Sequence, residues 1–180
     1  MKNKLPLEHL ADRHSGLTRS IGDGYSEAAA ICLSRHHQPP AELVVDCQGS
    51  ASEFSAEWEP PDQRTERAWA NEIDATEAGA YAISLAAIEM AKGLVAVRRA
   101  ETLTGADYYI APIGSAPEDL EGCLRLEVSG TDRGDQAVIK QRLKEKIKQA
   151  TAGASNLPAI ASVVGFRECA VVIAEVKEAL

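Results

Sequence analysis

The chain has 180 residues and a mass of 19.2 kDa, the size of one ordinary domain, with 45% hydrophobic and 26% charged residues. This composition excludes a disordered or collagen-like chain, and the length is sufficient to bury an apolar core without disulfides or a structural metal. The sequence has no run of eighteen uncharged apolar residues, and its basic start is soon interrupted by Glu8 and Asp12. We therefore expect neither a membrane span nor a signal peptide. Four cysteines without close spacing fit free thiols, which favours a cytoplasmic protein.

The net charge of −8 is unevenly distributed along the chain. Residues 133–150 carry six basic and two acidic side chains, a net charge of +4. Residues 1–132 carry 11 basic and 22 acidic side chains, a net charge of −11. The basic segment is interpreted either as a solvated helix face or as a surface that contacts phosphate or an acidic partner.

In chain order, the N-terminal part is predicted to be a small α+β region. Residues 1–23 are polar and interrupted by glycine, and we expect them to be loosely ordered. The elements predicted after them are a helix over 26–37, ended by a double proline, and short strands over 43–45 and 53–58. A second double proline, Pro60-Pro61, marks a boundary. Residues 1–60 are thus predicted to pack on a core formed by residues 61–180.

The core is predicted to alternate helices and strands. Asp74 and Glu77 have the spacing of a capping box, and Gly93 is placed to end the long helix that follows. The predicted elements are helices over 62–71, 75–92 and 134–151, and strands over 94–97, 108–111, 124–128, 159–164 and 170–176. This order predicts an α/β (α+β) fold in which helices flank a mixed central sheet.

Two carboxylates fall on neighbouring predicted strands. A hairpin centred near Glu118 would pair Asp107 with Ser129 and make Asp107 and Glu127 diagonal neighbours on one polar face, with Cβ atoms roughly 7–8 Å apart. Two carboxylates at that separation can share Mg²⁺ or Mn²⁺. The alternative is that both are ordinary surface acids on the hydrated face of an antiparallel sheet.

The element order from residue 74, together with Asp107 at the start of the second strand and Glu127 in the third, resembles the core of the PD-(D/E)xK restriction-endonuclease-like superfamily. The resemblance covers about residues 74–176. It implies that Asp107 and Glu127 bind a divalent metal, Mg²⁺ or Mn²⁺, that Glu77 joins them from the preceding helix, and that the activity is hydrolysis of phosphodiesters. The capping box is the alternative explanation for Glu77.

The sequence departs from the superfamily pattern at Ser129, which stands where the motif has lysine. A serine hydroxyl cannot supply positive charge to the phosphate. By helical angle, Lys146 and Arg142 flank the buried stripe of the basic helix, so either could replace the lysine. The alternative is that both only extend along the helix edge into water. Gln136 lies inside the stripe and is either a further site residue or a helix cap.

Two functions remain open from the sequence. One is a metal-dependent nuclease that contacts nucleic acid through the helix of residues 133–150. The other is a catalytically inactive nuclease-like fold that acts as a protein-interaction, accessory or immunity-type subunit or as a homodimer, which the net charge and Ser129 favour. Motifs for a serine hydrolase or a nucleotide-binding loop are absent, and the spacing of Cys32, His36, His37 and Cys47 fits no usual zinc site.

Overall fold

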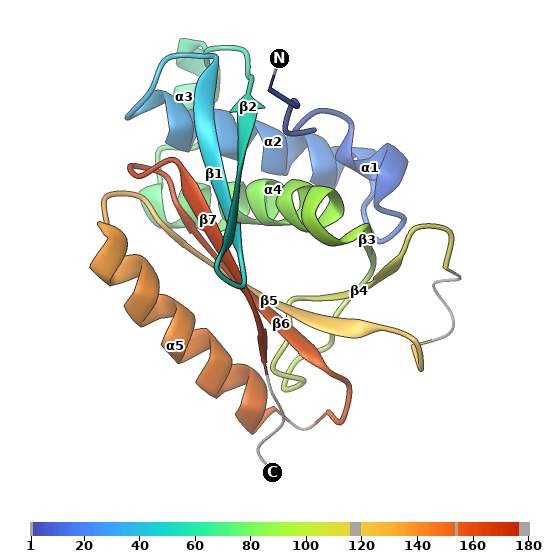
Figure 1. Cartoon of the computed structure of the whole chain (residues 1–180). Coiled ribbons are helices and arrows are strands. Elements are labelled where there is room, and N and C mark those ends of the chain that lie inside the picture. Colours follow the sequence, from blue (N-terminus) through green and yellow to red (C-terminus); the bar gives the residue numbers. More distant parts are fainter. Residues whose placement is uncertain (1, 116–119, 154, 177–180) are drawn as a thin grey trace.

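One mixed sheet organises the computed structural model, which describes residues 2–115, 120–153 and 155–176 (Figure 1). Within these residues seven strands follow the order β2-β1-β7-β6-β5-β4-β3 across the sheet. The strands are β1 (Ala41–Cys47), β2 (Ser50–Ala56), β3 (Leu94–Arg99), β4 (Tyr108–Pro112), β5 (Leu124–Thr131), β6 (Ala159–Gly165) and β7 (Ala170–Val176). The helices are α1 (Leu10–Arg13), α2 (Arg19–Ser34), α3 (Gln63–Ala68), α4 (Glu72–Lys92) and α5 (Gln136–Ala152). The predicted mixed α/β fold is confirmed.

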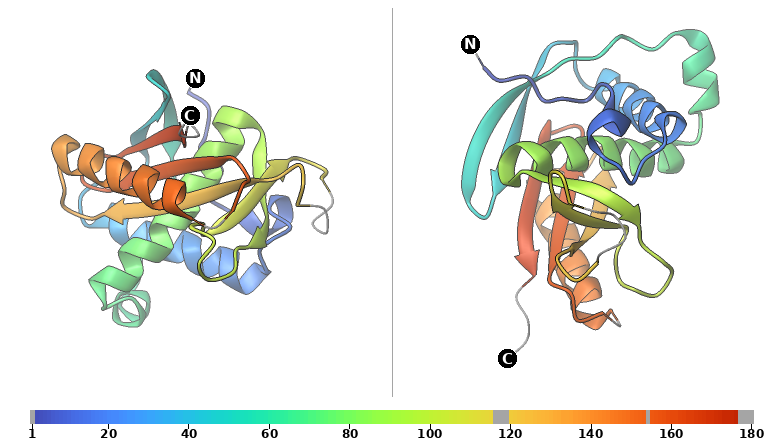
Figure 2. Two further views of the ribbon diagram at one scale, coloured as in Figure 1. Left: turned by 90° about the horizontal axis from the view of Figure 1, so that it is seen from below. Right: turned by 90° about the vertical axis from the view of Figure 1, so that its right-hand side faces the viewer.

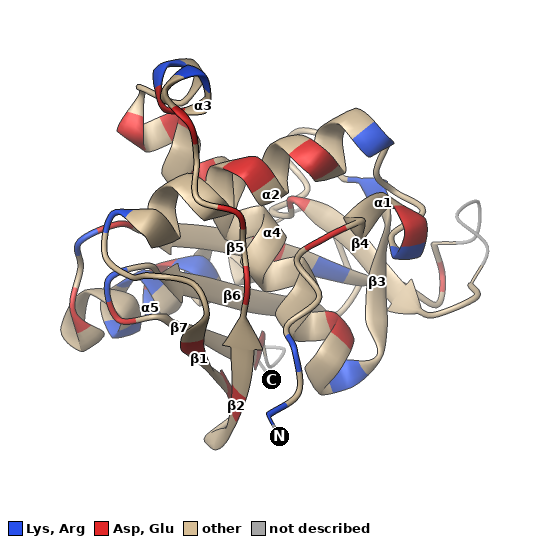
Figure 3. Cartoon of the chain, turned by 90° about the horizontal axis from the view of Figure 1, so that it is seen from above, with Lys and Arg blue, Asp and Glu red and all other residues tan. Residues whose placement is uncertain are grey.

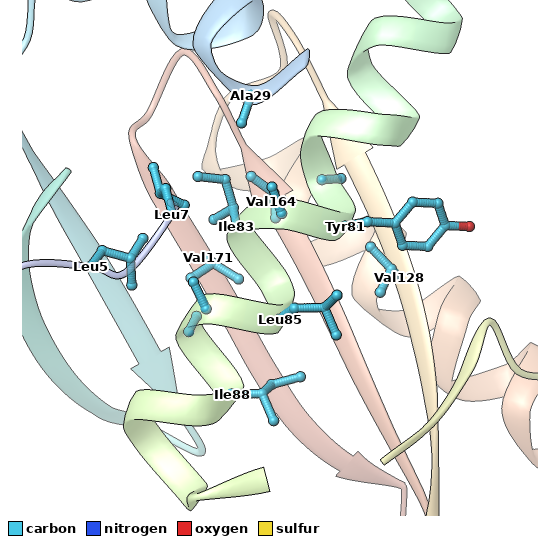
Figure 4. Close-up of a cluster of buried hydrophobic side chains, with 14 of the residues drawn as sticks. Leu5, Leu7, Ala29, Tyr81, Ile83, Leu85, Ile88, Val128, Val164 and Val171 are labelled. Atoms are coloured by element: carbon cyan, nitrogen blue, oxygen red, sulfur yellow. The ribbon is translucent and has the colours of Figure 1, made fainter. Parts of the chain in front are cut away.

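Helices cover both faces of the sheet. Helix α4 packs directly on one face, α2 packs on α4, and α5 packs on the opposite face against β5, β6 and β7. Viewed from below, the sheet lies between α5 on one side and the pair of α4 and α2 on the other (Figure 2). The main core lies under α4, where Ile83, Leu85 and Ile88 meet Val164 and Val171 of the sheet (Figure 4). No helix in the part of the chain that the structure describes is long and apolar enough to cross a membrane.

Helix α4 begins earlier than the sequence pattern predicts. Asn71 is its N-cap, and the Asn71 side chain accepts hydrogen bonds from the backbone N–H groups of Ile73 and Asp74. The predicted capping box of Asp74 and Glu77 is therefore wrong, because Asn71 already satisfies the first free donors of the helix. Gly93 ends the helix in the left-handed conformation at φ 65°, as predicted.

The N-terminal segment is ordered, contrary to the expectation from its polar composition. Leu5, Leu7, Leu10 and Leu17 are buried in the main core, and the backbone N–H of Leu5 bonds to a carbonyl of β2. Helix α2 starts at Arg19, well before the predicted start, because Thr18 caps it. The segment gains its order from burial of leucines that have no regular periodicity and therefore give no signal in the sequence.

Residues on both sides of Pro60-Pro61 contribute to the same sheet. Strand β1 pairs antiparallel with β2 and parallel with β7, so the hairpin of β1 and β2 extends the sheet beyond the C-terminal strands. The hairpin of β3 and β4 lies at the other end of the sheet (Figure 1).

The site depends on how β3, β4, β5 and α5 are joined. The first three strands form an antiparallel meander, and α5 carries the chain over to β6, which is parallel to β5. The pairing of β4 with β5 stops at Tyr108 and Leu126, whereas β5 continues to Thr131. On its other edge this stretch still pairs with β6, and helix α4 comes close to it at Gly130, where an added Cβ would lie 2.9 Å from the carbonyl oxygen of Thr76. The end of β5 therefore lies between α4 and α5.

Candidate functional site

The structure brings Asp107 and Glu127 together, in a register that differs from the predicted one. Tyr108 pairs with Leu126, and the N–H of Asp107 donates to the carbonyl of Leu126 at 2.7 Å. The predicted pairing of Asp107 with Ser129 is therefore wrong by two residues, and Asp107 lies beside Glu127 rather than diagonal to it. The centre of the predicted hairpin, near Glu118, lies outside the described residues.

Glu127 is not on a hydrated face. It is 2% exposed, and its neighbour on the same face of β5, Arg125, is 5% exposed. The alternation of polar and apolar residues along β5 predicted water on this side, but α5 covers it. The interpretation of Glu127 as an ordinary surface acid is therefore wrong.

Asp107 is held by groups from α4 and β5. Its Oδ1 accepts a hydrogen bond from the Tyr81 hydroxyl at 2.8 Å, and its Oδ2 accepts one from the backbone N–H of Val128 at 2.7 Å. Tyr81 extends from α4 past Val128 of β5, with its hydroxyl directed away from the apolar cluster (Figure 4). Arg99 of β3 is the nearby cation, with Nη2 3.8 Å from Oδ1. The carboxylate of Asp107 is thus fixed in orientation while each oxygen keeps a lone pair.

Glu127 is paired with Lys146 of α5. The Lys146 Nζ lies 2.9 Å from Oε2 of Glu127, and the two side chains are 21% and 3% exposed. Burial raises the pKa of Glu127 above its ordinary value, the hydrogen bond from Lys146 opposes this rise, and the charge of Asp107 adds to it. The net effect is a raised pKa, because the loss of hydration of the Glu127 carboxylate outweighs the stabilisation by Lys146.

Two clefts meet at Asp107. The first, of about 510 Å³, lies between α4, the end of β5 and α5, and is lined by Glu77, Tyr81, Asp107, Ser129, Arg142 and Lys146 among others. Arg142 is 3.3 Å from the Ser129 hydroxyl, to which it donates. The second cleft, of about 570 Å³, is bounded by the loop of residues 100–106 and the end of α5, and is lined by Arg99, Asp107, Glu127 and Gln149. A ligand in the first cleft therefore lies against Asp107, and one in the second cleft lies against both acids.

The remaining predicted site residues are placed differently. Glu77 is exposed on the wall of the first cleft. Gln136 is exposed in the first turn of α5, where its amide lies 3.4 Å from Glu168, and it lines neither cleft. The structure thus places Asp107, Glu127, Lys146, Arg142 and Glu77 around one region and Gln136 apart from it.

Metal ligands are not preassembled. Among residues 2–115, 120–153 and 155–176, no group of three or more His, Cys, Asp or Glu side chains is arranged to hold a metal ion. Asp107, Glu127 and Glu77 therefore do not form a ready three-carboxylate cage. Any cation here would depend on the acid pair together with water or substrate oxygens.

The sequence reading missed an aromatic cluster beside Asp107. The Arg99 guanidinium carbon lies 4.8 Å from the ring centroids of both Tyr81 and Tyr108, and the Tyr25 hydroxyl is 2.8 Å from that of Tyr108. The only signal in the sequence was local: Tyr108 directly follows Asp107, and Tyr81 is the one aromatic residue in an alanine-rich helix. The cluster combines residues from α2, α4, β3 and β4, and their convergence is a property of the fold.

The charges around the clefts differ on the two faces of the molecule. Acidic residues lie along α2 and α4, and basic residues lie on α5 (Figure 3). Lys140, Lys144 and Lys148 are exposed on α5, whereas Lys146 turns inward to Glu127. Beside the acid pair lie Arg99, Arg125 and Lys146, and Arg142 adds a further positive charge to the wall of the first cleft.

Comparison with protein-family models, with curated proteins and with solved structures found no match. The residues of the acid pair and their surroundings are therefore the basis for a functional proposal.

Proposed function

We propose that this chain is a divalent-metal-dependent phosphodiester hydrolase, a nuclease of the PD-(D/E)xK kind in which Lys146 replaces the lysine missing at Ser129. The observation that carries the proposal is the 2.9 Å contact of Lys146 with Glu127, next to Asp107 and at the edge of an open cleft. The order α4–β3–β4–β5–α5–β6, with one acid just before the second of these strands and one in the third, supports it.

The position of Lys146 supports its proposed role. A phosphodiester gains negative charge as it is attacked, and a cation fixed beside the reacting phosphate stabilises that charge. Ser129 cannot do this, whereas Lys146 lines the cleft with its ammonium group held on Glu127. Arg142, also in the cleft wall, adds a second positive charge for a neighbouring phosphate.

The acid pair fits a cation of the Mg²⁺ type. Such ions are commonly held by one or two carboxylates, with substrate phosphate and water completing the coordination. Asp107 and Glu127 would hold the ion, since each retains acceptor capacity beyond the bonds it already makes. When bound, the ion would supply a Lewis acid and a water of lowered pKa.

The other residues of the site keep this arrangement in place. Tyr81 and the Val128 N–H orient the Asp107 carboxylate, and the cover of α5 keeps water from the Glu127 side chain. Low solvent access strengthens the attraction between these groups and a charged ligand.

The test is cleavage of single- and double-stranded DNA and RNA with Mn²⁺, using Asp107→Asn, Glu127→Gln and Lys146→Met. Each substitution should lower the cleavage rate by about 100-fold or more, because each removes a group that acts on the phosphate or the ion. Lys144→Met is the matched control: it removes an exposed lysine of the same helix and should leave the rate unchanged. Equal cleavage by the folded wild type and by Glu127→Gln would refute the proposal.

One observation favours the inactive, protein-interaction alternative. Lys146 and Arg99 already place a positive charge beside each acid, so the pair is balanced without an ion. The two functions separate in the same experiment. A wild type that neither cleaves any substrate nor melts at a higher temperature with Mn²⁺ would leave the interaction function as the better account.

A further inference from the structure

Arg99 has no part in the hydrolytic arrangement above, yet its guanidinium is held against two aromatic rings beside Asp107. It comes from the last position of β3 and stacks on Tyr81 and Tyr108 with its guanidinium carbon 4.8 Å from each ring centroid. The two rings are themselves in an edge-to-face contact at 5.7 Å, and Tyr25 packs on Tyr81 at 5.0 Å. An arginine held on a rigid aromatic platform loses little conformational freedom when it binds a ligand.

The donors of Arg99 are mostly unused. A guanidinium has five N–H groups that point outward from the edge of its plane. Stacking on aromatic rings occupies its two faces and leaves this edge free. Among the described residues Arg99 donates one hydrogen bond, to the Tyr81 hydroxyl at 3.1 Å. Its distance of 3.8 Å from Asp107 is too long for a hydrogen bond, and Asp107 is already bonded to Tyr81 and Val128.

The free edge of Arg99 is available to a ligand. Its side chain is 50% exposed, and it lines the second cleft together with Asp107 and Glu127. Glu101, which lines the same cleft, is bonded to Arg98 and Tyr109 and therefore does not neutralise Arg99. The free fork of donors on Arg99 matches the geometry of a phosphate group, which a guanidinium binds through two parallel N–H···O bonds.

We propose that Arg99 is a phosphate-binding residue that positions the backbone of a nucleic-acid strand in the second cleft. The strand then crosses Asp107 into the first cleft, where Arg142 meets its next part. This inference rests on the proposed function for the reaction, but it concerns binding and specifies the ligand as a phosphodiester backbone. It adds a recognition site between the loop of residues 100–106 and the end of α5.

Arg98 provides a matched control. It precedes Arg99 in β3 and is 51% exposed, but it is ion-paired with Glu101 and does not line the second cleft. The measurement is the fluorescence anisotropy of a short labelled single-stranded DNA in EDTA, titrated with protein at several salt concentrations. EDTA removes any contribution from a divalent ion, so binding is read separately from cleavage.

Arg99→Ala should weaken binding about tenfold, because it removes a charge-assisted contact. It should also reduce the slope of log affinity against log salt by about 0.7, the value for one lost phosphate contact on a single strand. Arg99→Lys should keep part of the slope but not the full affinity, since lysine lacks the planar fork. Arg98→Ala leaves Glu101 bonded to Tyr109 and should lower the affinity far less than Arg99→Ala. If Arg99→Ala does not fold, Arg99→Gln replaces it, since glutamine can still bond to Tyr81.

The outcomes separate this inference from the nuclease. Equal affinity and equal salt slope for the Arg98 and Arg99 variants, or no DNA binding by the wild type, would overturn it. DNA binding that depends on Arg99 in a protein that cleaves nothing would uphold this inference while the nuclease fails. With cleavage present, Arg99→Ala should raise KM more than it lowers kcat, whereas a purely structural role would lower thermal stability and leave the salt slope unchanged.

Discussion

Replacing Lys146 by methionine perturbs the ion pair on which the site depends. Methionine keeps much of the side-chain volume but leaves the Glu127 carboxylate, 3% exposed, without its cation. Breaking a fully buried pair costs about 3–5 kcal/mol. Lys146 is 21% exposed, and water therefore screens part of its interaction, so we expect Lys146→Met to lower the free energy of unfolding by about 2–3 kcal/mol near neutral pH.

The pH dependence of this loss identifies its cause. The pKa of Glu127 is raised in the folded protein above its ordinary value of 4.5, so the folded state binds the proton more tightly than the unfolded state. Stability contributed by this group therefore decreases as pH rises from 4.5 through the folded pKa. Removing Lys146 raises the folded pKa further and widens this range. The cost of Lys146→Met should thus be small at about pH 4, where Glu127 is protonated in both states, and complete near pH 7.

The assay is urea unfolding of the wild type, Lys146→Met, Glu127→Gln and the double variant at both pH values. Glu127→Gln should restore most of the stability lost in Lys146→Met, because a neutral amide needs no cation. Lys144→Met should change the free energy of unfolding by less than about 0.5 kcal/mol, as expected of an exposed surface residue. A loss in Lys146→Met that is the same at both pH values, or that persists in the double variant, would show that the ion pair is not its origin.

Two further predictions concern the fold around the site. His14 is fully buried, its Nδ1 accepts the N–H of Ala96, and burial lowers its pKa from 6.5 to about 4. The free energy of unfolding of the wild type should therefore rise by at most about 3 kcal/mol as the pH increases between these two values. His14→Gln should flatten this part of a plot of unfolding free energy against pH, and an unchanged slope would contradict the assignment. At the crossing of α2 and α4, Gly79→Ala places a Cβ 3.0 Å from the backbone of Ala29 and should cost about 1–3 kcal/mol in thermal unfolding. Gly24→Ala, where no atom lies within 4 Å, should instead be neutral or stabilise by about 0.5–1 kcal/mol, and similar effects of the two substitutions would show that the helices do not meet as described.

From residue 26 onward, the sequence alone determined the order of the elements and the ends that depend on local chemistry. The strand over 170–176 and the end of α4 at Gly93 are found where the pattern predicted them, because a short apolar run and the freedom of glycine act over a few residues. Asp107 and Glu127 could likewise be identified as neighbours, since a short antiparallel meander leaves few ways to arrange two adjacent strands.

The register and the burial of the site were decided by tertiary structure. Two hairpin registers that differ by two residues keep the same side chains on the same face of the sheet. The alternation that located the strands therefore could not distinguish the two registers. Whether the polar face of β5 meets water depends on where α5 packs, and that packing puts Lys146 on Glu127. Arg99 gains its aromatic platform from residues far apart in the chain, and the early leucines are ordered by a core formed elsewhere. Local patterns determine which helices and strands form. The surroundings of each charged side chain in the site are determined by contacts between distant segments, and local patterns do not encode those contacts.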